Sequence, residues 1–328
     1  MPPGVELKII ETGFLPRAAR SCHASTVLPL KDGRVLCAWF AGAQEGERDV
    51  EIYLSCLEKG VWSAPERMSV EEGPCWNPVL FENEQGEILL YYKTDEDFWL
   101  GKSRLDQWYT RLRISKDGGR TFSASETLVE GDRGGRGPVR NHPITLKNGT
   151  VLAPASLEKG PWTAFVDVSE DGGHTFVPSN TIVIDGVDGD RRGVIQPALW
   201  EDESGVHMLL RSTENAICRS DSADGRIWSS AERTGMPNNN SGIDLCRLPG
   251  GTLALVHNPV TSTSTEGART PLIISLSCDN GVTFSPACTL AWEPGEYSYP
   301  SIMFDGEYLH VSHTWKREDI RYARIAII

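Results

Sequence analysis

The sequence predicts an all-β fold: a six-bladed β-propeller of four-stranded antiparallel blades, formed by one domain over residues 1–328. Three observations indicate it. An eight-residue motif occurs three times, a pair of short apolar segments around a glycine occurs six times, and the unit that holds both is about 55 residues long. The 32 glycines and 20 prolines supply tight turns between short strands, whereas no long helical heptad pattern is present.

The repeated motif, here called the box, reads SKDGGRTF at 115–122, SEDGGHTF at 169–176 and SCDNGVTF at 277–284. We expect each box to be the turn between the third and fourth strands of a blade. Its aspartate should accept hydrogen bonds from the turn backbone, its last glycine should take a positive φ, and its phenylalanine should pack on the blade. The residues in these roles are Asp117, Asp171 and Asp279; Gly119, Gly173 and Gly281; and Phe122, Phe176 and Phe284.

The second repeated feature is a hairpin of two apolar strands with glycine near its turn. Its six copies span 23–40, 77–93, 142–156, 196–211, 242–257 and 299–315. A third strand and a box, or the remnant of one, follow the hairpin and complete a four-stranded unit. The last unit supplies three strands, whereas the chain begins with an unassigned strand at 5–10. Because a ring with open edges would aggregate, we expect the N-terminal strand to complete the sixth blade.

Composition excludes several classes of function. The formal net charge of −13 argues against a nucleic acid partner and against binding to an anionic membrane surface. No apolar run reaches the roughly 20 residues that span a bilayer, and no secretory leader is recognisable, so we expect a cytoplasmic protein. The eight cysteines form no CxxC pair and are expected to be reduced. No phosphate-binding glycine loop or metal-ligand spacing is present, so we expect no cofactor and no metal.

A site is expected on the face opposite the boxes, which we call the loop face. It carries the loops between strands two and three and the loops between blades. The first residues of the innermost strands open there, and they are polar or aromatic: His23, Asn77, His142, Gln196, Tyr297 and Tyr299. Their convergence from different blades favours a pocket, and Trp162 on a neighbouring loop offers an apolar face to a sugar ring.

Basic residues also fall at loop-face positions. They are Arg20, Arg140, Arg211 and Arg269. A guanidinium group matches a carboxylate with two parallel hydrogen bonds. The sequence therefore predicts a glycan partner that bears a carboxylate.

The boxes, the six units and the loop-face arginines resemble the sialidase superfamily of Asp-box, or BNR-repeat, propellers over essentially the whole chain. This resemblance implies a carboxylate clamp that includes Arg211 and Arg269, and a tyrosine nucleophile at Tyr297, with Tyr299 as the second choice. It also implies an acid/base on the first-blade loop, where Asp49 and Glu45 lie.

Two family positions differ in this sequence. The first clamp arginine falls at His23, so Arg20 or His23 itself would take that role. The glutamate that activates the tyrosine falls at Gln196, and a neutral amide cannot accept the tyrosine proton.

Three functions remain open from the sequence. The first is an exo-glycosidase that releases a terminal acidic sugar, sialic-acid-like or uronate-linked. The second is a lyase that performs β-elimination beside a uronate carboxylate, for example at a rhamnose–glucuronate linkage, using His23, His142 and a tyrosine. The third is a propeller that binds glycans without catalysis, which the neutral Gln196 favours.

Overall fold

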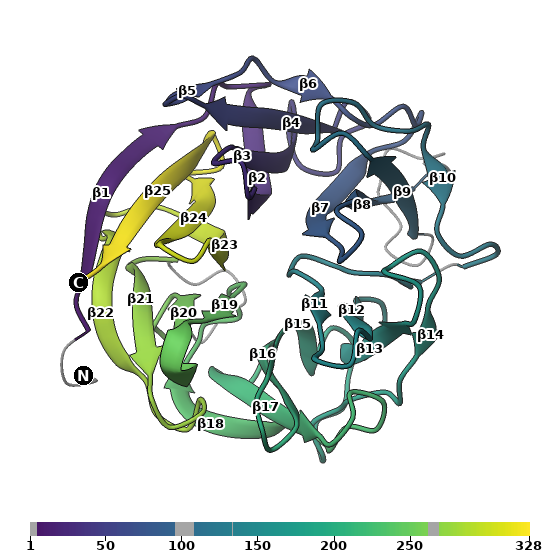
Figure 1. Cartoon of the computed structure of the whole chain (residues 1–328). Helices are drawn as coiled ribbons and strands as arrows, with labels where there is room; N and C mark the ends of the chain where they lie inside the picture. The colour runs from purple at the N-terminus through teal and green to yellow at the C-terminus, as the bar shows by residue number, and fades with distance from the viewer. Residues whose placement is uncertain (1–4, 96–107, 133, 262–268) are drawn as a thin grey trace.

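The computed structural model describes residues 5–95, 108–132, 134–261 and 269–328. Six β-sheets surround a central axis, and each runs outwards from an innermost strand beside that axis (Figure 1). Neighbouring strands within each sheet are antiparallel. The predicted six-bladed β-propeller is confirmed. No helix among the described residues is long and apolar enough to cross a membrane.

The blades follow one another along the chain. Blade 1 contains β2 (Ser21–Pro29), β3 (Val35–Gly42) and β4 (Glu51–Glu58), with the short β5 (Val61–Trp62) and β6 (Glu66–Arg67) both paired to β4. Blade 2 contains β7 (Cys75–Glu82), β8 (Ile88–Thr94), β9 (Tyr109–Ser115) and β10 (Glu126–Thr127). Blade 3 contains β11 (Ile144–Thr145), β12 (Val151–Leu157), β13 (Thr163–Ser169) and β14 (Val177–Pro178).

The second half of the chain repeats the pattern. Blade 4 contains β15 (Val194–Glu201), β16 (Val206–Ser212), β17 (Ala216–Ser222) and β18 (Glu232–Pro237). Blade 5 contains β19 (Asp244–Arg247), β20 (Leu253–His257), β21 (Leu272–Ser277) and β22 (Ser285–Ala291), with the 3-10 turn η1 (Pro249–Gly251) between its first two strands. Blade 6 contains β23 (Tyr297–Phe304), β24 (Tyr308–Trp315), β25 (Asp319–Ile327) and β1 (Leu7–Phe14).

The two ends of the chain close the ring. Strand β1 pairs antiparallel with β25, from Leu7 opposite Ile327 to Phe14 opposite Arg321. The backbone of Glu6 also exchanges two hydrogen bonds of 2.9 Å with Ile328. The expected closing strand is therefore confirmed, and it extends beyond the predicted 5–10. Because β1 covers the outer edge of β25, the sixth blade has four strands, as blade 5 does.

The boxes form the predicted turns. In the second box, Asp171 Oδ1 accepts hydrogen bonds from the backbone N–H groups of His174 (3.1 Å) and Thr175 (2.9 Å), and Oδ2 accepts one from the Thr175 hydroxyl (2.6 Å). Asp117 and Asp279 accept equivalent bonds in their own boxes. The last box glycines have the expected positive φ, +78° at Gly119, +97° at Gly173 and +78° at Gly281.

Each box also attaches its blade to the preceding one. Tyr91 of blade 2 donates a hydrogen bond of 2.7 Å to the carbonyl of Gly173 in the blade 3 box. Arg34 of blade 1 donates one of 2.8 Å to Gly118 in the blade 2 box, and Trp200 of blade 4 donates one of 2.7 Å to Asn280 in the blade 5 box. The repeated motif therefore stabilises both its own turn and the contact between neighbouring blades.

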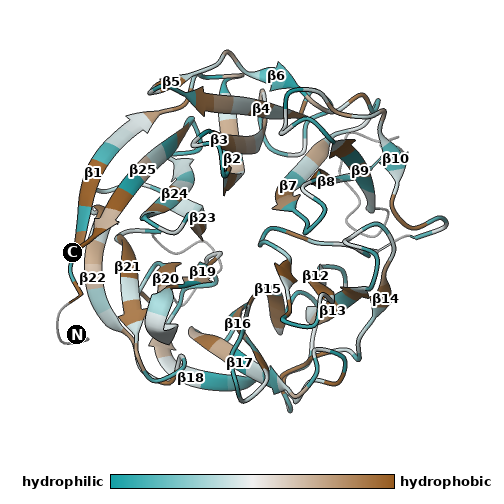
Figure 2. Ribbon diagram, in the orientation of Figure 1, coloured by the Kyte–Doolittle hydropathy of each residue, from teal (hydrophilic) through white to brown (hydrophobic). Residues whose placement is uncertain are grey.

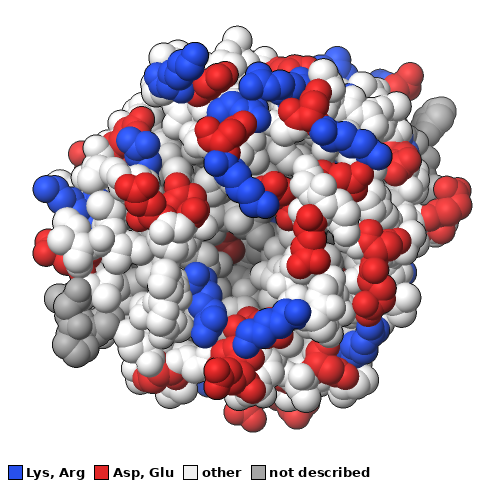
Figure 3. Space-filling model, viewed as in Figure 1, with Lys and Arg blue, Asp and Glu red and all other residues white. Residues whose placement is uncertain are grey.

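The core lies within and between the blades. In Figure 2, strands β12, β15 and β21 are mainly hydrophobic, whereas the outer strand β18 is mainly hydrophilic. All eight cysteines are free; four are buried, and Cys278 is exposed. Viewed along the axis, the surface is hollowed at its centre and ringed by charged side chains of both signs (Figure 3).

We expect Gly173→Ala to destabilise the protein more than Gly33→Ala. Both glycines have left-handed backbone, with φ of +97° and +87°, so both substitutions carry a dihedral cost of about 1 kcal/mol. A Cβ at Gly173 would lie 2.5 Å from the Tyr91 hydroxyl oxygen, whereas one at Gly33 would meet nothing within 4 Å. The extra crowding should cost about 1–3 kcal/mol more in the free energy of unfolding, measured by urea denaturation. Equal losses in the two variants would contradict the close blade contact.

Candidate functional site

Five of the six blades place a residue with left-handed backbone where the innermost strand opens on the loop face. These residues are Ala24 (φ +53°), Asn77 (+47°), Arg140 (+73°), Gln196 (+54°) and Tyr299 (+48°). The pairing register shifts at the corresponding points of β2, β7, β15 and β23, as in a β-bulge. Such a conformation costs of order 1–3 kcal/mol in a non-glycine residue and is concentrated at functional sites. Bulges also turn a side chain out of the regular alternation of a strand.

Tyr299 lies at the centre of this ring of residues. Its hydroxyl accepts a hydrogen bond of 2.9 Å from Arg211 Nη1. The His23 ring lies 4.4 Å from the Tyr299 ring, centroid to centroid. The guanidinium carbons of Arg140 and Arg269 lie 5.2 and 5.6 Å from the Tyr299 ring centroid. Side chains from blades 1, 3, 4, 5 and 6 therefore meet at one tyrosine.

Gly242 of blade 5 leaves space for the side chains that surround Tyr299. A Cβ at this position would lie 3.7 Å from Tyr299 Cα and 3.8 Å from Gln196 Oε1. A larger side chain would therefore extend between the tyrosine and the glutamine.

Arg211 is buried, with 6% of its surface exposed, and its described partners are neutral. Its Nε donates to Asn240 Oδ1 at 2.8 Å, and its Nη1 donates to Gln196 Oε1 at 3.1 Å as well as to Tyr299. No carboxylate among the described residues lies within ion-pair distance of it. A buried cation without a counter-ion is costly, so this arrangement favours binding of an anion.

Gln196 connects Arg211 to a carboxylate. Its amide Nε2 donates a hydrogen bond of 3.0 Å to Glu158 Oε1, on the loop between β12 and β13. The same loop carries Trp162, whose indole donates to the Glu158 carbonyl at 3.2 Å and whose ring lies 5.5 Å from the Arg211 guanidinium carbon. The structure therefore brings the predicted residues Gln196, Trp162 and Arg211 together in one cluster.

A fourth guanidinium group, that of Arg317, reaches this cluster from the β24–β25 loop. Glu296 Oε1 accepts hydrogen bonds of 3.0 Å from both Arg269 Nη1 and Arg317 Nε. Although burial alone would raise the pKa of Glu296, the charges of Arg269 and Arg317 hold it below its ordinary value. Arg317 also pairs with Glu45, so that predicted acid/base residue lies at the rim of the cluster.

His23 is a neutral member of the site. Burial lowers the pKa of His23 well below its ordinary value, and the nearby charges of Arg317 and Arg269 lower it further. Its Nδ1 lies 2.9 Å from the Thr314 hydroxyl oxygen, which itself accepts the N–H of Ala24 at 3.1 Å. The hydroxyl hydrogen can thus be donated to Nδ1, which leaves Nε2 as an N–H donor. This buried Nε2 has no partner among the described residues.

The structure separates Tyr297 from the cluster. Tyr297 is fully buried, its ring lies 4.6 Å from that of Trp315, and its hydroxyl has no hydrogen-bond partner among the described residues. In a regular strand Tyr297 and Tyr299 would point to the same side. The register shift between Ser298 and Ser301 removes this regularity. Of the two predicted tyrosines, Tyr299 therefore lies in the cluster and Tyr297 lies outside it.

Arg140 crosses the axis below Tyr299. From blade 3 it donates hydrogen bonds to the carbonyls of Ser25 in blade 1, at 3.0 Å, and Pro300 in blade 6. Burial lowers its pKa to about 10, which still leaves it charged at neutral pH. Arg140 thus forms a floor between the loop-face cluster and the rest of the central channel, rather than a freely accessible ligand group.

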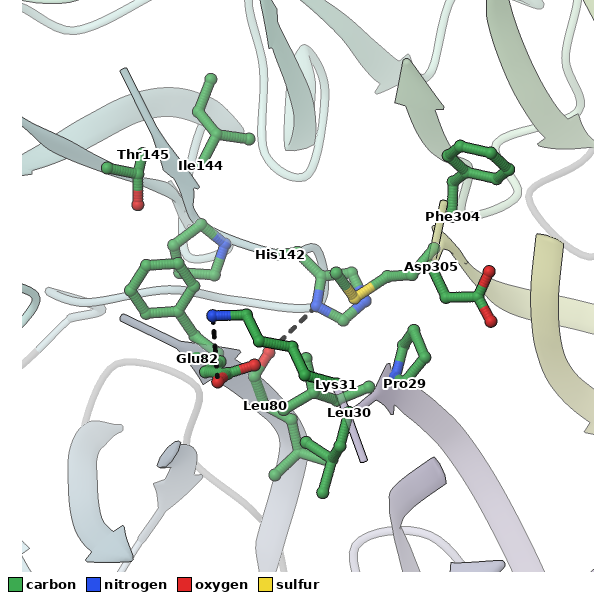
Figure 4. Close-up of a pocket in the computed structure, with 14 residues that line it drawn as sticks. Pro29, Leu30, Lys31, Leu80, Glu82, His142, Ile144, Thr145, Phe304 and Asp305 are labelled. Atoms are coloured by element: carbon green, nitrogen blue, oxygen red, sulfur yellow. Dashed lines mark hydrogen bonds and ion pairs between the residues drawn. The ribbon is translucent and has the colours of Figure 1, made fainter. Parts of the chain in front are cut away.

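His142 lies on the box-face side of the channel, not beside Tyr299. Its Nδ1 donates to the Leu80 carbonyl at 3.0 Å, and its Nε2 lies 2.8 Å from the Ser301 hydroxyl oxygen. It lines a cavity of about 420 Å³ whose walls include Leu28, Phe81 and Met303. Figure 4 shows this cavity, with the Lys31–Glu82 ion pair at its edge. Burial lowers the pKa of His142 to about 4.

The remaining predicted residues lie around the cluster. Asp49 Oδ2 accepts the backbone N–H of Ala43 at 3.0 Å and so stabilises its own loop. Arg20 is exposed immediately before β2, and Asn77 is buried at the start of β7. Within the described ranges, no group of three or more His, Cys, Asp or Glu side chains could hold a metal ion.

The sequence interpretation missed Glu158, Asn240 and Arg317. Glu158 and Arg317 lie in loops that were recognised as part of the loop face, but no motif distinguished them from other charged loop residues. Asn240 precedes its strand in an Asn-rich segment, 238–240, that reads as an ordinary turn.

Asp244, the first residue of β19 in blade 5, should make the free energy of unfolding depend on pH. Burial raises its pKa to about 7, while Ile302 and Leu245 donate backbone hydrogen bonds to it at 2.9 and 3.0 Å. The folded protein therefore holds this proton up to a higher pH than the unfolded chain does, and the free energy of unfolding should fall between about pH 4 and pH 7. The wild type is compared with the Asp244→Asn variant. Both proteins contain the neighbouring His142 and Arg140, so these two side chains are common to both measurements. Urea denaturation should show the stability difference changing across this range; a constant difference would contradict the raised pKa.

Comparison with known proteins identifies the chain's relatives. The model of the BNR repeat-like domain family matches residues 33–311. A search of curated proteins found no match. Among solved structures, a Dyadobacter fermentans protein of unknown function is 18% identical, with a TM-score of 0.78 over 99% of this chain and 100% of that chain.

Two sialidases share the fold. The Hadza microbial sialidase Hz136 is 17% identical, with a TM-score of 0.75 over 93% of this chain and 65% of its own. The Trypanosoma rangeli sialidase is 14% identical, with a TM-score of 0.72 over 99% of this chain and 60% of its own. The chain thus spans less than two thirds of these sialidases, and such low identity supports the shared fold alone. With the family model covering most of its length, the chain belongs to the BNR repeat-like domain family.

Proposed function

We propose that the protein binds a glycan through a carboxylate-bearing terminal sugar at the Tyr299 cluster and releases that sugar by hydrolysis. The observation that carries the proposal is the buried Arg211, whose described partners are all neutral. A sugar carboxylate would supply the missing negative charge and would accept the two parallel hydrogen bonds that a guanidinium group offers. Sialic acid, bound in one of the Trypanosoma rangeli sialidase structures, is such a sugar.

Arg269 and Arg317 complete the proposed clamp. They share the carboxylate of Glu296, and Arg317 also pairs with Glu45, so these four charges balance and Arg211 remains the cation without a described counter-ion. The first clamp position, where the sequence has His23, offers a neutral N–H donor in place of a cation. Arg317, rather than the exposed Arg20, is then the third arginine. Trp162, beside Arg211, would pack against the apolar face of the sugar.

Tyr299 is the proposed nucleophile or stabilising group at the anomeric carbon. A tyrosine suits a sugar whose anomeric centre bears a carboxylate, because an anionic side chain would be repelled by it. Glu45 and Asp49 remain the proposed acid/base residues of the first-blade loop. Glu45 is favoured by position, since Arg317 links it to Glu296.

Elimination at a uronate is the second candidate reaction. Two observations favour it: Gln196 provides no carboxylate to take the Tyr299 proton, and the neutral His23 ring contacts the Tyr299 ring. A lyase needs a base for the proton next to the carboxylate and cations that neutralise that carboxylate. Tyr299, His23 and Arg211 would supply these, without His142. Binding without catalysis remains the third outcome of the tests below.

Product masses should separate the reactions. The protein is incubated with a panel of sialylated and uronate-containing glycans, and products are measured by mass spectrometry. Hydrolysis gives fragments whose masses sum to the substrate plus one water. Fragments that sum to the substrate alone would establish elimination instead, and the absence of any product with retained binding would leave a glycan-binding protein.

Arg211→Ala should weaken binding of N-acetylneuraminic acid or D-glucuronic acid by about 10- to 100-fold, the range expected for loss of a charged hydrogen bond. Titration calorimetry measures the dissociation constant, with Arg233→Ala on the outer strand β18 as the control for loss of one positive charge. Unchanged binding in Arg211→Ala would refute the proposed clamp.

Tyr299→Phe should lower kcat by about 100-fold or more while sugar binding is retained, because the lost hydroxyl acts on the reacting bond. Tyr297→Phe removes a hydroxyl that has no described partner and should leave kcat near the wild-type value. The reverse pattern would restore Tyr297 as the reactive residue.

A further inference from the structure

The amide of Gln196 lies between a cation and an anion. Its Oε1 accepts a hydrogen bond of 3.1 Å from Arg211 Nη1, and its Nε2 donates one of 3.0 Å to Glu158 Oε1. The amide is therefore the link between the residue that contacts the Tyr299 hydroxyl and a carboxylate on the β12–β13 loop of the neighbouring blade.

These two neighbours fix the orientation of the amide. If the amide were flipped, its NH₂ group would face the Arg211 donor, and its oxygen would face the Glu158 carboxylate. Both contacts would be repulsive, because donors would meet donors and acceptors would meet acceptors.

Glu158 is itself held in place by its loop. The Ser156 hydroxyl lies 3.4 Å from its Oε1, and the Glu158 carbonyl accepts the indole N–H of Trp162 at 3.2 Å. Among the described residues, no Lys, Arg or His forms an ion pair with it. Its carboxylate therefore hydrogen-bonds Gln196 without a direct ion-pair partner, while its charge also acts on the buried Lys93.

We propose that Glu158 is a positioning residue for the anion-binding site: it orients Gln196, and Gln196 holds Arg211 against the Tyr299 hydroxyl without neutralising it. This inference rests on the proposed function. A carboxylate directly at position 196 would pair with Arg211 and compete with the sugar carboxylate. An amide there, oriented by a carboxylate one residue farther away, stabilises the geometry and leaves the Arg211 charge for the ligand. The site is thereby tuned to anionic sugars over neutral ones.

Two substitutions at position 158 test this role. Glu158→Ala removes the acceptor for Gln196 Nε2 and should weaken binding of N-acetylneuraminic acid and D-glucuronic acid by about 10-fold, measured by titration calorimetry. Glu158→Gln keeps a carbonyl acceptor and should recover most of this loss. If Glu158→Gln binds as weakly as Glu158→Ala, the carboxylate charge itself is needed and the positioning role is wrong. Glu203→Ala, an exposed residue on the β15–β16 turn, is the control.

Gln196→Glu provides the complementary test. It brings a carboxylate to Arg211 and sets it against Glu158, so binding of both acidic sugars should weaken by about 10-fold or more. Stronger binding of the acidic sugars by Gln196→Glu would overturn the proposal.

The inference and the proposed function can fail separately. If Arg211→Ala weakens binding of the acidic sugars and Glu158→Ala does not, the clamp stands and the role of Glu158 is refuted. If neither sugar binds the wild-type protein, the proposed function fails, and a ligand-free measurement still tests the contact between Glu158 and Gln196. In that measurement, the urea midpoints of Glu158→Ala, Gln196→Ala and the double variant are compared. Non-additive shifts support the coupling of the two side chains, and additive shifts refute it.

Discussion

The antiparallel pairing of β1 with β25 is the constraint on which the rest of the structure depends. It joins the two ends of the chain, so the six innermost strands are held around one axis instead of along an open array. Residues as distant in sequence as His23 and Tyr299 then become neighbours. The boxes add the second constraint, since each one bonds the preceding blade. A site assembled from five blades is possible because the ring fixes where every innermost strand begins.

The loop-face ends of these strands combine strain with rigid support. Tyr299 and Gln196 have left-handed backbones, which cost free energy, but the strands that carry them are hydrogen-bonded to their neighbours over most of their length. Arg140 adds a connection across the axis from blade 3 to blades 1 and 6. The surrounding ring therefore holds the strained residues in positions that an isolated strand would not keep. This is the physical basis for regarding the cluster as a functional site.

The repeats made the fold predictable from the sequence, because each box and each hairpin is a local pattern whose glycine has a definite conformational reason. The site was only partly predictable. Arg211, Arg269, His23, Gln196 and Trp162 were recognised from strand and loop positions. Tyr297 was preferred to Tyr299 from the sequence, but the structure places Tyr299 in the cluster and Tyr297 outside it, because a register shift interrupts the strand and no residue pattern marks that shift. Glu158 and Arg317 were missed since their contacts join different blades, and His142 was grouped with His23 although it lies below Arg140.

The arginines in the interior of the propeller differ in how their charges are balanced, and this difference distinguishes the Tyr299 cluster. Arg111 pairs with the buried Glu71, and Arg136 pairs with the buried Asp167, so the chain neutralises arginines where they serve the packing of blades 2 and 3. Arg211 is as deeply placed, yet amide and phenol oxygens are its described partners. Position 196 could accommodate a carboxylate of nearly the same shape, and the sequence has the amide instead. The positive charge beside Tyr299 therefore supports the proposal of an anionic ligand.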